Sequence, residues 1–218
     1  MLFGAIDYLN LLPFQIFLKR YIKNSAIHMG IKKHRNVPSA INKAFFERKI
    51  NAAFISSVTS GRCRCSDTGI VAFKNVYSVL LKPGSSKSDA ASQTSNALAV
   101  ILGLQGEVAI GDKALKEYLD GTESIDLANE WYKKTKLPFV FARLCYHEKR
   151  EFIEKLSKTF VNTKIFIPQY ILKREAAKRG IKPNDVRWYL DHINYNIDPK
   201  SKKALKIFLT GAKRAKLI

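Results

Sequence analysis

Short stretches of hydroxyl and amide side chains follow the apolar runs of this 218-residue chain. In an open α/β sheet, ligands bind beyond the carboxyl ends of strands, so polar residues at those points are the first candidates for a binding site. Four stretches qualify: Tyr8, Leu9 and Asn10; Ser56 and Ser57; Ser92, Gln93, Thr94 and Ser95; and Gly111 and Asp112. Taken singly, each also suits a helix cap or a turn. Together they predict a site for a small carboxylate or phosphate, because hydroxyls and free N–H groups at helix N-termini bind anions.

The common catalytic and nucleotide-binding signatures are absent from the sequence. None of the four polar stretches contains a strong acid and base pair. The chain has no G-x-G-x-x-G, no G-x-x-x-x-G-K-[ST], no H-E-x-x-H and no G-x-S-x-G. These absences speak against nucleotide hydrolysis and zinc proteolysis.

The cysteines indicate neither a disulfide framework nor a metal site. The chain has three, Cys63, Cys65 and Cys145, and an odd number fits a reducing compartment better than a secreted, cross-linked fold. The C-x-C spacing is not that of a zinc site, and the four histidines provide no second ligand pair. We therefore expect free thiols in a loop and no metal. With no window long and apolar enough to span a membrane and no recognisable signal peptide, the expected location is cytoplasmic.

The order of apolar patterns predicts an α/β fold. A short apolar run at residues 2–6, a helical pattern at 12–22, a strand at 29–37, a helix from Pro38 and a strand at 52–57 make a β-α-β-α-β series, which implies a parallel sheet with crossover helices. Further along we expect strands at 69–73, 77–81, 107–110 and 137–146, and helices at 94–102, 113–118, 126–136, 148–160, 168–179, 184–194 and 200–215. Asp126, Asp198 and Gly180 are the expected caps. The chain is thus expected to end in helices, without further strands.

Charge along the chain suggests two lobes. Residues 1–82 carry 13 basic and 3 acidic side chains, residues 83–146 carry 7 and 8, and residues 147–218 carry 18 and 7, for a net charge of +20. The two ends resemble each other, and a Gly, Pro and Ser-rich segment at 82–95 reads as a linker. We expect a larger discontinuous lobe from 1–82 and 146–218 and a smaller inserted lobe from 83–145. The basic balance also indicates an anionic partner.

Six segments, in the same order, resemble one enzyme family. They are IDYLNLLPF (6–14), VPSAINKAFFERKINAAFISS (37–57), YSVLLK (77–82), SQTS (92–95), VAIGDKAL (108–115) and LANEWYKKTKLPFVFA (127–142), and they span about 140 residues. This set resembles the chorismate dehydratases of the futalosine route to menaquinone. The resemblance implies a two-lobed type II periplasmic-binding-protein-like α/β fold, here with a helical C-terminal region. It also implies a cytoplasmic hydro-lyase that holds chorismate between its lobes and converts it to 3-[(1-carboxyvinyl)oxy]benzoate and water.

The resemblance also assigns two residues to the reaction, with no metal or cofactor. The key amide of the family falls on Asn10, which would point into the interlobe cleft and hydrogen-bond the substrate, and the key hydroxyl falls on Ser78, which would face it. Neither side chain is a base at neutral pH, so both would orient the substrate and stabilise developing charge, and the proton acceptor is hypothesised to be the substrate's own side-chain carboxylate. The expected substrate-binding residues are Tyr8, Ser56, Ser57, Ser92, Thr94, Ser95 and Asp112.

Two features depart from the family. Only Gly103 to Gly106 separate the expected helix at 94–102 from the strand at 107–110, where the family often has an added strand and helix. The second lobe is therefore trimmed, and any contacts made by the missing part are in doubt. The family does not require a charge of +20 either.

Three other functions compete with this reading. A solute-binding protein would have the same fold without the chemistry, and a secretory signal would favour it. The family's sister enzyme, which cleaves a later intermediate to dihydroxynaphthoate, matches YLNLLP and LPFVFA less well. A nucleic-acid binder could use the lysines of residues 200–216, although an apolar stripe there indicates a helix packed on its own domain. We expect no specific nucleic acid and no membrane span, and the oligomeric state stays open.

Overall fold

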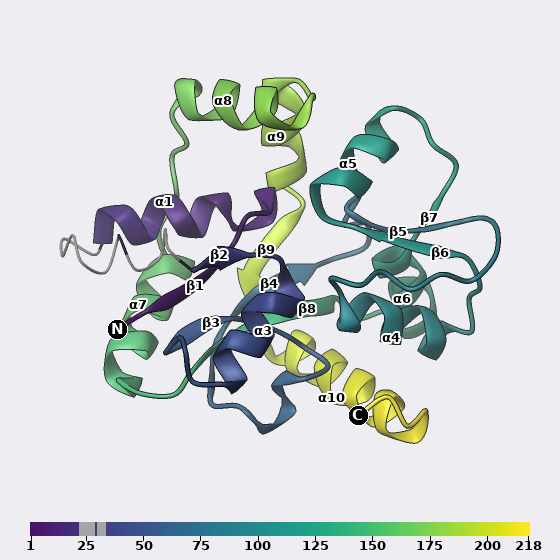
Figure 1. Cartoon of the computed structure of the whole chain (residues 1–218), viewed down its shortest axis with the longest axis horizontal. Helices are drawn as coiled ribbons and strands as arrows, with labels where there is room; N and C mark the ends of the chain where they lie inside the picture. The colour runs from purple at the N-terminus through teal and green to yellow at the C-terminus, as the bar shows by residue number, and fades with distance from the viewer. Residues whose placement is uncertain (22–28, 30–33) are drawn as a thin grey trace.

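Two β-sheets organise the chain, and helices cover them (Figure 1). The computed structural model describes residues 1–21, 29 and 34–218. Within these ranges a six-stranded sheet has the order β2-β1-β3-β8-β4-β9, and a three-stranded sheet has the order β6-β5-β7. The strands are β1 (Phe3–Ile6), β2 (Arg35–Asn36), β3 (Ala52–Ser56), β4 (Cys65–Ala72), β5 (Val79–Lys82), β6 (Glu107–Ile110), β7 (Ile125–Asp126), β8 (Phe139–Tyr146) and β9 (Ile193–Asn196).

The first half of the large sheet confirms the predicted parallel arrangement. β1 lies between β2 and β3 and runs parallel to both. β3 is buried along its whole length, as its continuous apolar run requires of a strand covered on both faces. β8 is antiparallel to β3 and β4, and β9 is antiparallel to β4. The sheet is therefore mixed, with its parallel part at the N-terminal end of the chain.

The small sheet and its helices form a separate group, which we call the small lobe. It contains β5, β6 and β7 with α4 (Gln93–Leu102), α5 (Gly111–Leu119) and α6 (Leu127–Thr135). In Figure 1 these elements gather at one side of the molecule, beside the large sheet. All the strand pairs of the small lobe are antiparallel. We call the six-stranded sheet and its helices the large lobe.

Strand pairing moves the limits of the predicted lobes. The predicted ranges, 1–82 with 146–218 and 83–145, put β5 in the larger lobe and most of β8 in the smaller one. β5 pairs instead with β6 and β7, and β8 pairs with β3 and β4. Hydrogen-bond partners, which the sequence does not reveal, decide which sheet a strand joins. The Gly, Pro and Ser-rich segment is consequently a loop inside the small lobe.

The helices of the large lobe follow the predicted pattern closely. They are α1 (Leu12–Tyr21), α3 (Pro38–Phe46), α7 (Arg150–Val161), α8 (Gln169–Arg179), α9 (Pro183–Leu190) and α10 (Pro199–Arg214), with short 3-10 helices η1 (Leu9–Leu11) and η2 (Ser60–Arg62). Asp198 caps α10 by accepting from the Ser201 N–H at 2.7 Å, and Gly180 ends α8 with φ of 64°. Phe208 and Ala212 of α10 are buried, and the helix packs against β8 and α4. The apolar stripe of this basic helix therefore faces its own protein.

Two strand predictions are wrong or incomplete. The predicted helix at 184–194 ends at Leu190, and β9 follows it and pairs with β4. A four-residue edge strand is too short to show a period of its own, so the C-terminal region was expected to be entirely helical. The predicted strand at 29–37 is reduced to β2, while residues 30–33 lie outside the described residues.

The expectation of a loop with two thiols at Cys63 and Cys65, and of no disulfide, is also wrong. Cys65 and Cys145 lie opposite each other on β4 and β8 and form a disulfide, with 3.9 Å between their Cα atoms. Cys63 is free and half-buried. The two bonded residues are 80 positions apart in sequence, so only the pairing of their strands brings them together. Among the described helices, none is long and apolar enough to cross a bilayer.

Candidate active site

A small cavity lies between the two lobes and contains both residues singled out by the family resemblance. Its volume is about 60 Å³. Polar side chains from both lobes line it: Tyr8, Asn10, Ser56, Ser78, Ser92 and Ser95. The rest of the wall is apolar and includes Phe54, Ile70 and Phe141. The cavity thus offers neutral hydrogen-bonding groups against an apolar surface, and among the described residues no carboxylate or ammonium group lines it.

Asn10 has a side chain that is free to bind a ligand. It lies in η1, directly after β1, and is half-buried. Its backbone carbonyl accepts a hydrogen bond from the Tyr195 hydroxyl at 2.6 Å. Its side-chain amide makes no hydrogen bond within the described part of the chain. The backbone is therefore held while the amide remains available in the cavity.

Ser78 lies on the small-lobe side of the same cavity, one residue before β5. It is 2% exposed, and its Oγ lies 2.8 Å from the hydroxyl oxygen of Tyr189 in α9. Its backbone carbonyl accepts from the Gly111 N–H at 2.8 Å. Burial raises the pKa of Tyr189 well above that of a free phenol, so this hydroxyl stays neutral. Ser78 is therefore fixed through its backbone by the small lobe and through its side chain by the large lobe.

Asp126 fixes the segment that leads to Ser78. Its Oδ1 caps α6 by accepting from the N–H groups of Ala128 and Asn129 at 3.0 and 3.1 Å. Its Oδ2 accepts from the N–H groups of Val76 and Tyr77 at 2.8 and 2.7 Å. Tyr77 has φ of 61°, a strained conformation for a residue other than glycine, and these bonds help to stabilise it. The predicted helix cap at Asp126 is confirmed. The second role of Asp126, which is to fix the segment before Ser78, depends on a contact between residues 50 positions apart.

We expect Asp126→Asn to lower the free energy of unfolding by about 2 to 4 kcal/mol, because one pair of backbone donors would face an amide NH2 instead of an oxygen. Urea denaturation of the variant and the wild type measures this difference. Glu130→Gln is a matched control, since the Glu130 carboxylate contacts only the exposed Lys133 ammonium in the described structure. Equal stability of Asp126→Asn and wild type would contradict the double role of Asp126.

A buried asparagine that sequence reasoning missed orients Ser56. Asn42 of α3 donates from Nδ2 to the Ser56 Oγ at 2.8 Å and accepts from the Ser56 N–H at 3.2 Å. Because the Ser56 oxygen accepts this bond, its own proton is free to bond a ligand in the cavity. The sequence signal was weak: one polar residue next to Ile41 on the apolar side of a helix.

Ser92 and Ser95 present a second free hydroxyl at the N-terminus of α4. The Ser92 Oγ accepts from the Ser95 N–H at 3.2 Å and donates to the Ser95 Oγ at 2.8 Å. The Ser95 proton then has no partner in the described residues and is available in the cavity. A hydroxyl donor at a helix N-terminus is well placed for a carboxylate.

Three of the predicted binding residues do not line the cavity. Ser57 directly follows β3 and is fully buried, and its Oγ has no hydrogen-bond partner among the described residues. The Thr94 Oγ1 accepts from the Val58 N–H at 3.2 Å and links the lobes. Asp112 also binds the other lobe. Thr94 and Asp112 therefore have structural partners within the protein.

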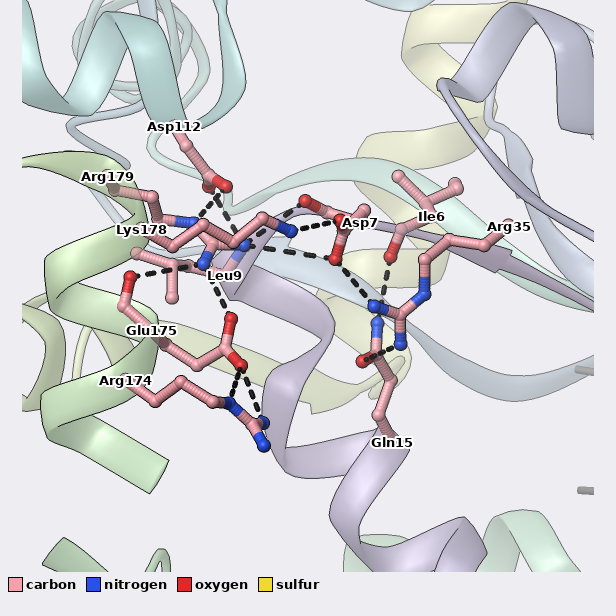
Figure 2. A network of polar contacts seen from close by, with 10 residues as sticks. All are labelled: Ile6, Asp7, Leu9, Gln15, Arg35, Asp112, Arg174, Glu175, Lys178 and Arg179. Atoms are coloured by element: carbon pink, nitrogen blue, oxygen red, sulfur yellow. Dashed lines mark hydrogen bonds and ion pairs between the residues drawn. The ribbon is translucent and has the colours of Figure 1, made fainter. Parts of the chain in front are cut away.

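Asp112 joins the small lobe to the large lobe through two contacts, which we call the interlobe clasp (Figure 2). Its Oδ1 accepts from the Leu9 N–H at 2.9 Å, and its Oδ2 accepts from Arg179 Nε. The Arg179 side chain is 7% exposed and also donates to Glu175 Oε2 at 2.6 Å and to the Asp7 carbonyl at 3.2 Å. Burial raises the pKa of Asp112, and the Arg179 guanidinium opposes that shift. No local sequence signal pairs α5 with α8.

Tyr8 closes the wall of the cavity next to the clasp. Its ring packs against Gly111, where an added Cβ would lie 2.7 Å from the Tyr8 Cζ. Gly111 also has φ of 70°, so glycine is required there for two reasons. Burial raises the pKa of Tyr8 to about 12, which keeps its hydroxyl protonated.

The cavity is far smaller than the roughly 300 to 1,000 Å³ of pockets that hold small molecules. A ring-sized ligand therefore requires more space than this cavity offers, and separation of the two lobes would supply it. The interlobe clasp and the bond between Ser78 and Tyr189 lie between parts that would move. Across the described ranges, no group of three or more His, Cys, Asp or Glu residues is arranged to hold a metal ion.

Comparison with known proteins identifies the family of this chain. A family model described as menaquinone biosynthesis matches residues 90–214. The chorismate dehydratase of Campylobacter jejuni subsp. jejuni is 46% identical over 222 residues and covers 100% of both chains.

Two solved structures share the fold at low identity. A protein from Archaeoglobus fulgidus has a TM-score of 0.65 and 13% identity, covering 99% of this chain and 97% of that one. The alkanesulfonate-binding protein of Xanthomonas axonopodis pv. citri, bound to MOPS, has a TM-score of 0.53 and 12% identity, covering 99% and 92%. The predicted periplasmic-binding-protein-like fold is thus confirmed. On the full-length identity to the Campylobacter enzyme, the chain belongs to the menaquinone-biosynthesis family that contains chorismate dehydratase.

Proposed function

We propose that this protein is a chorismate dehydratase, a hydro-lyase that converts chorismate to 3-[(1-carboxyvinyl)oxy]benzoate and water in futalosine-dependent menaquinone biosynthesis. One observation carries the proposal beyond family membership. Asn10 and Ser78 come from different lobes and line one cavity whose other polar groups, among the described residues, are neutral. Such a site suits a reaction whose driving force is the aromatisation of the substrate ring.

The chemistry needs little from the protein. The proton leaves the ring carbon that bears the enolpyruvyl ether, and its C–H electron pair forms the new ring double bond. The neighbouring C–O bond breaks, and the hydroxyl departs as water after taking up a proton. Because the ring becomes aromatic, the elimination is strongly downhill. The enzyme must mainly hold the ring in the reactive geometry and stabilise charge that develops on oxygen.

Asn10 and Ser78 are the proposed catalytic residues. The Asn10 amide has two N–H donors and no partner among the described residues, so it can bond a substrate oxygen. Ser78 lines the same cavity from the small-lobe side. Neither group is a base at neutral pH, and the proton acceptor in this proposal is the side-chain carboxylate of the substrate.

The free hydroxyls of Ser56 and Ser95 are the proposed carboxylate contacts, together with the protonated Tyr8. They approach the cavity from different elements, which suits a ligand that carries two carboxylates. The apolar wall next to them, including Phe54 and Phe141, fits the face of a ring. A cytoplasmic location accompanies this proposal, since the enzyme would share a compartment with its substrate.

Incubation of the purified protein with chorismate, without added metal or cofactor, tests the function. We expect chorismate to disappear, a new aromatic absorbance to form, and the product mass to be lower by one water. A solute-binding protein of the same fold would be stabilised by chorismate but would leave it intact. That result would contradict the proposed activity.

A further inference from the structure

We propose that two tyrosines of the C-terminal region, Tyr189 and Tyr195, are positioning residues for the reaction: Tyr189 sets Ser78 as a hydrogen-bond donor, and Tyr195 holds Asn10 in place. The inference rests on the proposed function and adds two residues that are distant in sequence from both catalytic candidates. It is carried by two hydrogen bonds, at 2.8 Å from Tyr189 to Ser78 and at 2.6 Å from Tyr195 to Asn10.

The hydrogen bond between Tyr189 and Ser78 has a defined direction. Tyr189 is 1% exposed, and within the described structure its hydroxyl has one hydrogen-bond partner, the Ser78 Oγ. A buried phenol proton without an acceptor is costly, so Tyr189 must donate to Ser78. Its raised pKa keeps that proton on the phenol. The proton of Ser78 is then directed away from Tyr189.

The only polar surroundings left for the Ser78 proton, among the described residues, lie in the cavity. Ser78 therefore acts as a donor toward a substrate oxygen, such as the hydroxyl that departs or an oxygen on which charge develops. A chain of two hydroxyls polarises in one direction, so the bond from Tyr189 also strengthens donation by Ser78. The chain supplies a hydrogen bond only, and no proton is transferred along it.

Tyr195 acts on Asn10 in a different way. Its hydroxyl donates to the backbone carbonyl of Asn10, in η1, and its ring packs edge-on against Phe160 with 5.0 Å between centroids. The bond leaves the Asn10 amide free, while it fixes the chain that carries this amide. Burial raises the pKa of Tyr195 well above that of a free phenol, so its hydroxyl also remains a donor.

Both tyrosines come from consecutive elements, α9 and β9. One short segment of the large lobe therefore contacts both catalytic candidates. Ser78 precedes β5 of the small lobe, whereas Asn10 follows β1 of the large lobe. Because Ser78 belongs to the part that would move on opening, the contact with Tyr189 is complete only when the lobes are closed. Ser78 would thus become an oriented donor at the moment when the substrate is enclosed.

Tyr→Phe substitutions test the inference, since each removes one oxygen and keeps the ring. We expect Tyr189→Phe to lower kcat about 10- to 100-fold with KM within threefold, as a weakened donor would. In a Ser78→Ala background, Tyr189→Phe should not lower kcat further. It should also raise Tm relative to Ser78→Ala alone, because Ser78→Ala leaves the buried Tyr189 phenol without an acceptor.

Tyr195→Phe should lower kcat about 3- to 10-fold, and this effect should disappear in an Asn10→Ala background. The effect of Tyr195→Phe on Tm should persist in the Asn10→Ala background, because the backbone carbonyl at position 10 remains.

Tyr146→Phe is the matched control, because the Tyr146 hydroxyl donates to Glu154 at 2.9 Å and does not line the cavity. Its kcat should equal that of the wild type. If Tyr189→Phe lowers Tm but keeps full kcat, or if its effect on kcat multiplies with that of Ser78→Ala, the positioning role is wrong while the dehydratase activity stands. A wild type that leaves chorismate intact would overturn both the activity and this inference.

Discussion

Asn10→Ala should lower kcat for chorismate about 100- to 1,000-fold, the usual cost of removing one donor that stabilises developing charge. The expectation follows from the free amide in the cavity, which has no other partner among the described residues. The fold should be preserved, because the hydrogen bond from Tyr195 goes to the backbone carbonyl. Steady-state kinetics with chorismate, together with Tm of the variant, measures both parts of the prediction.

Two further variants make this test specific. Asn10→Asp keeps the shape of the side chain but replaces its donors with a negative charge, so it should lower kcat at least as much and raise KM for an anionic substrate. Ser60→Ala removes a buried hydroxyl that bonds the Ser57 carbonyl and does not line the cavity, and it should retain wild-type kcat. A folded Asn10→Ala with full turnover would show that the amide has no part in the reaction.

Arg179→Met should lower the free energy of unfolding by about 2 to 3 kcal/mol and reduce kcat/KM about tenfold or more. The side chain is 7% exposed and pairs with Asp112 and Glu175, whose side chains are 17% and 12% exposed. Methionine keeps much of the apolar stem but leaves both carboxylates without this partner. Because Asp112 belongs to the small lobe, the loss also weakens the closed arrangement of the lobes.

Lys178→Met is the control for the clasp. Lys178 is the neighbouring cation on α8, and its ion pair with Asp7 is exposed and lies within the large lobe (Figure 2). Its loss should change stability by about 0.5 kcal/mol or less and leave kcat/KM unchanged. Urea denaturation, kinetics and the radius of gyration in solution with and without chorismate compare the two variants. If Arg179→Met loses stability but keeps wild-type kcat/KM and compaction, the clasp has no role in closure.

Sequence reasoning was most successful where the signal is local. Helix caps such as Asp126, Asp198 and Ser92 depend on a side chain and backbone N–H groups two or three residues away, and each was correctly placed or lies at the predicted helix start. The strand at Glu107–Ile110 was predicted at its observed limits. Such features need only short-range geometry, which a few consecutive residues determine.

The site was found in part for the same reason. Polar residues at strand exits and at the start of α4 are visible in the sequence, and Tyr8, Asn10, Ser56, Ser92 and Ser95 do line one cavity. Ser78 was found only through the family resemblance. The partners that orient these groups, Asn42, Tyr189 and Tyr195, gave no comparable signal. Each makes its contact through side-chain packing between residues from 14 to 185 positions apart.

By itself, the sequence determined the parallel β-α-β-α-β start, the positions of most helices with their main caps, and the family to which the chain belongs. The tertiary structure alone decided that β5 joins the small sheet, that β9 exists, that Cys65 meets Cys145, and that Arg179 holds Asp112. The physical reason is the range of the interactions involved. Periodicity and capping act within one or two turns of chain, whereas strand partners, buried ion pairs and oriented hydroxyls depend on which distant segments pack together.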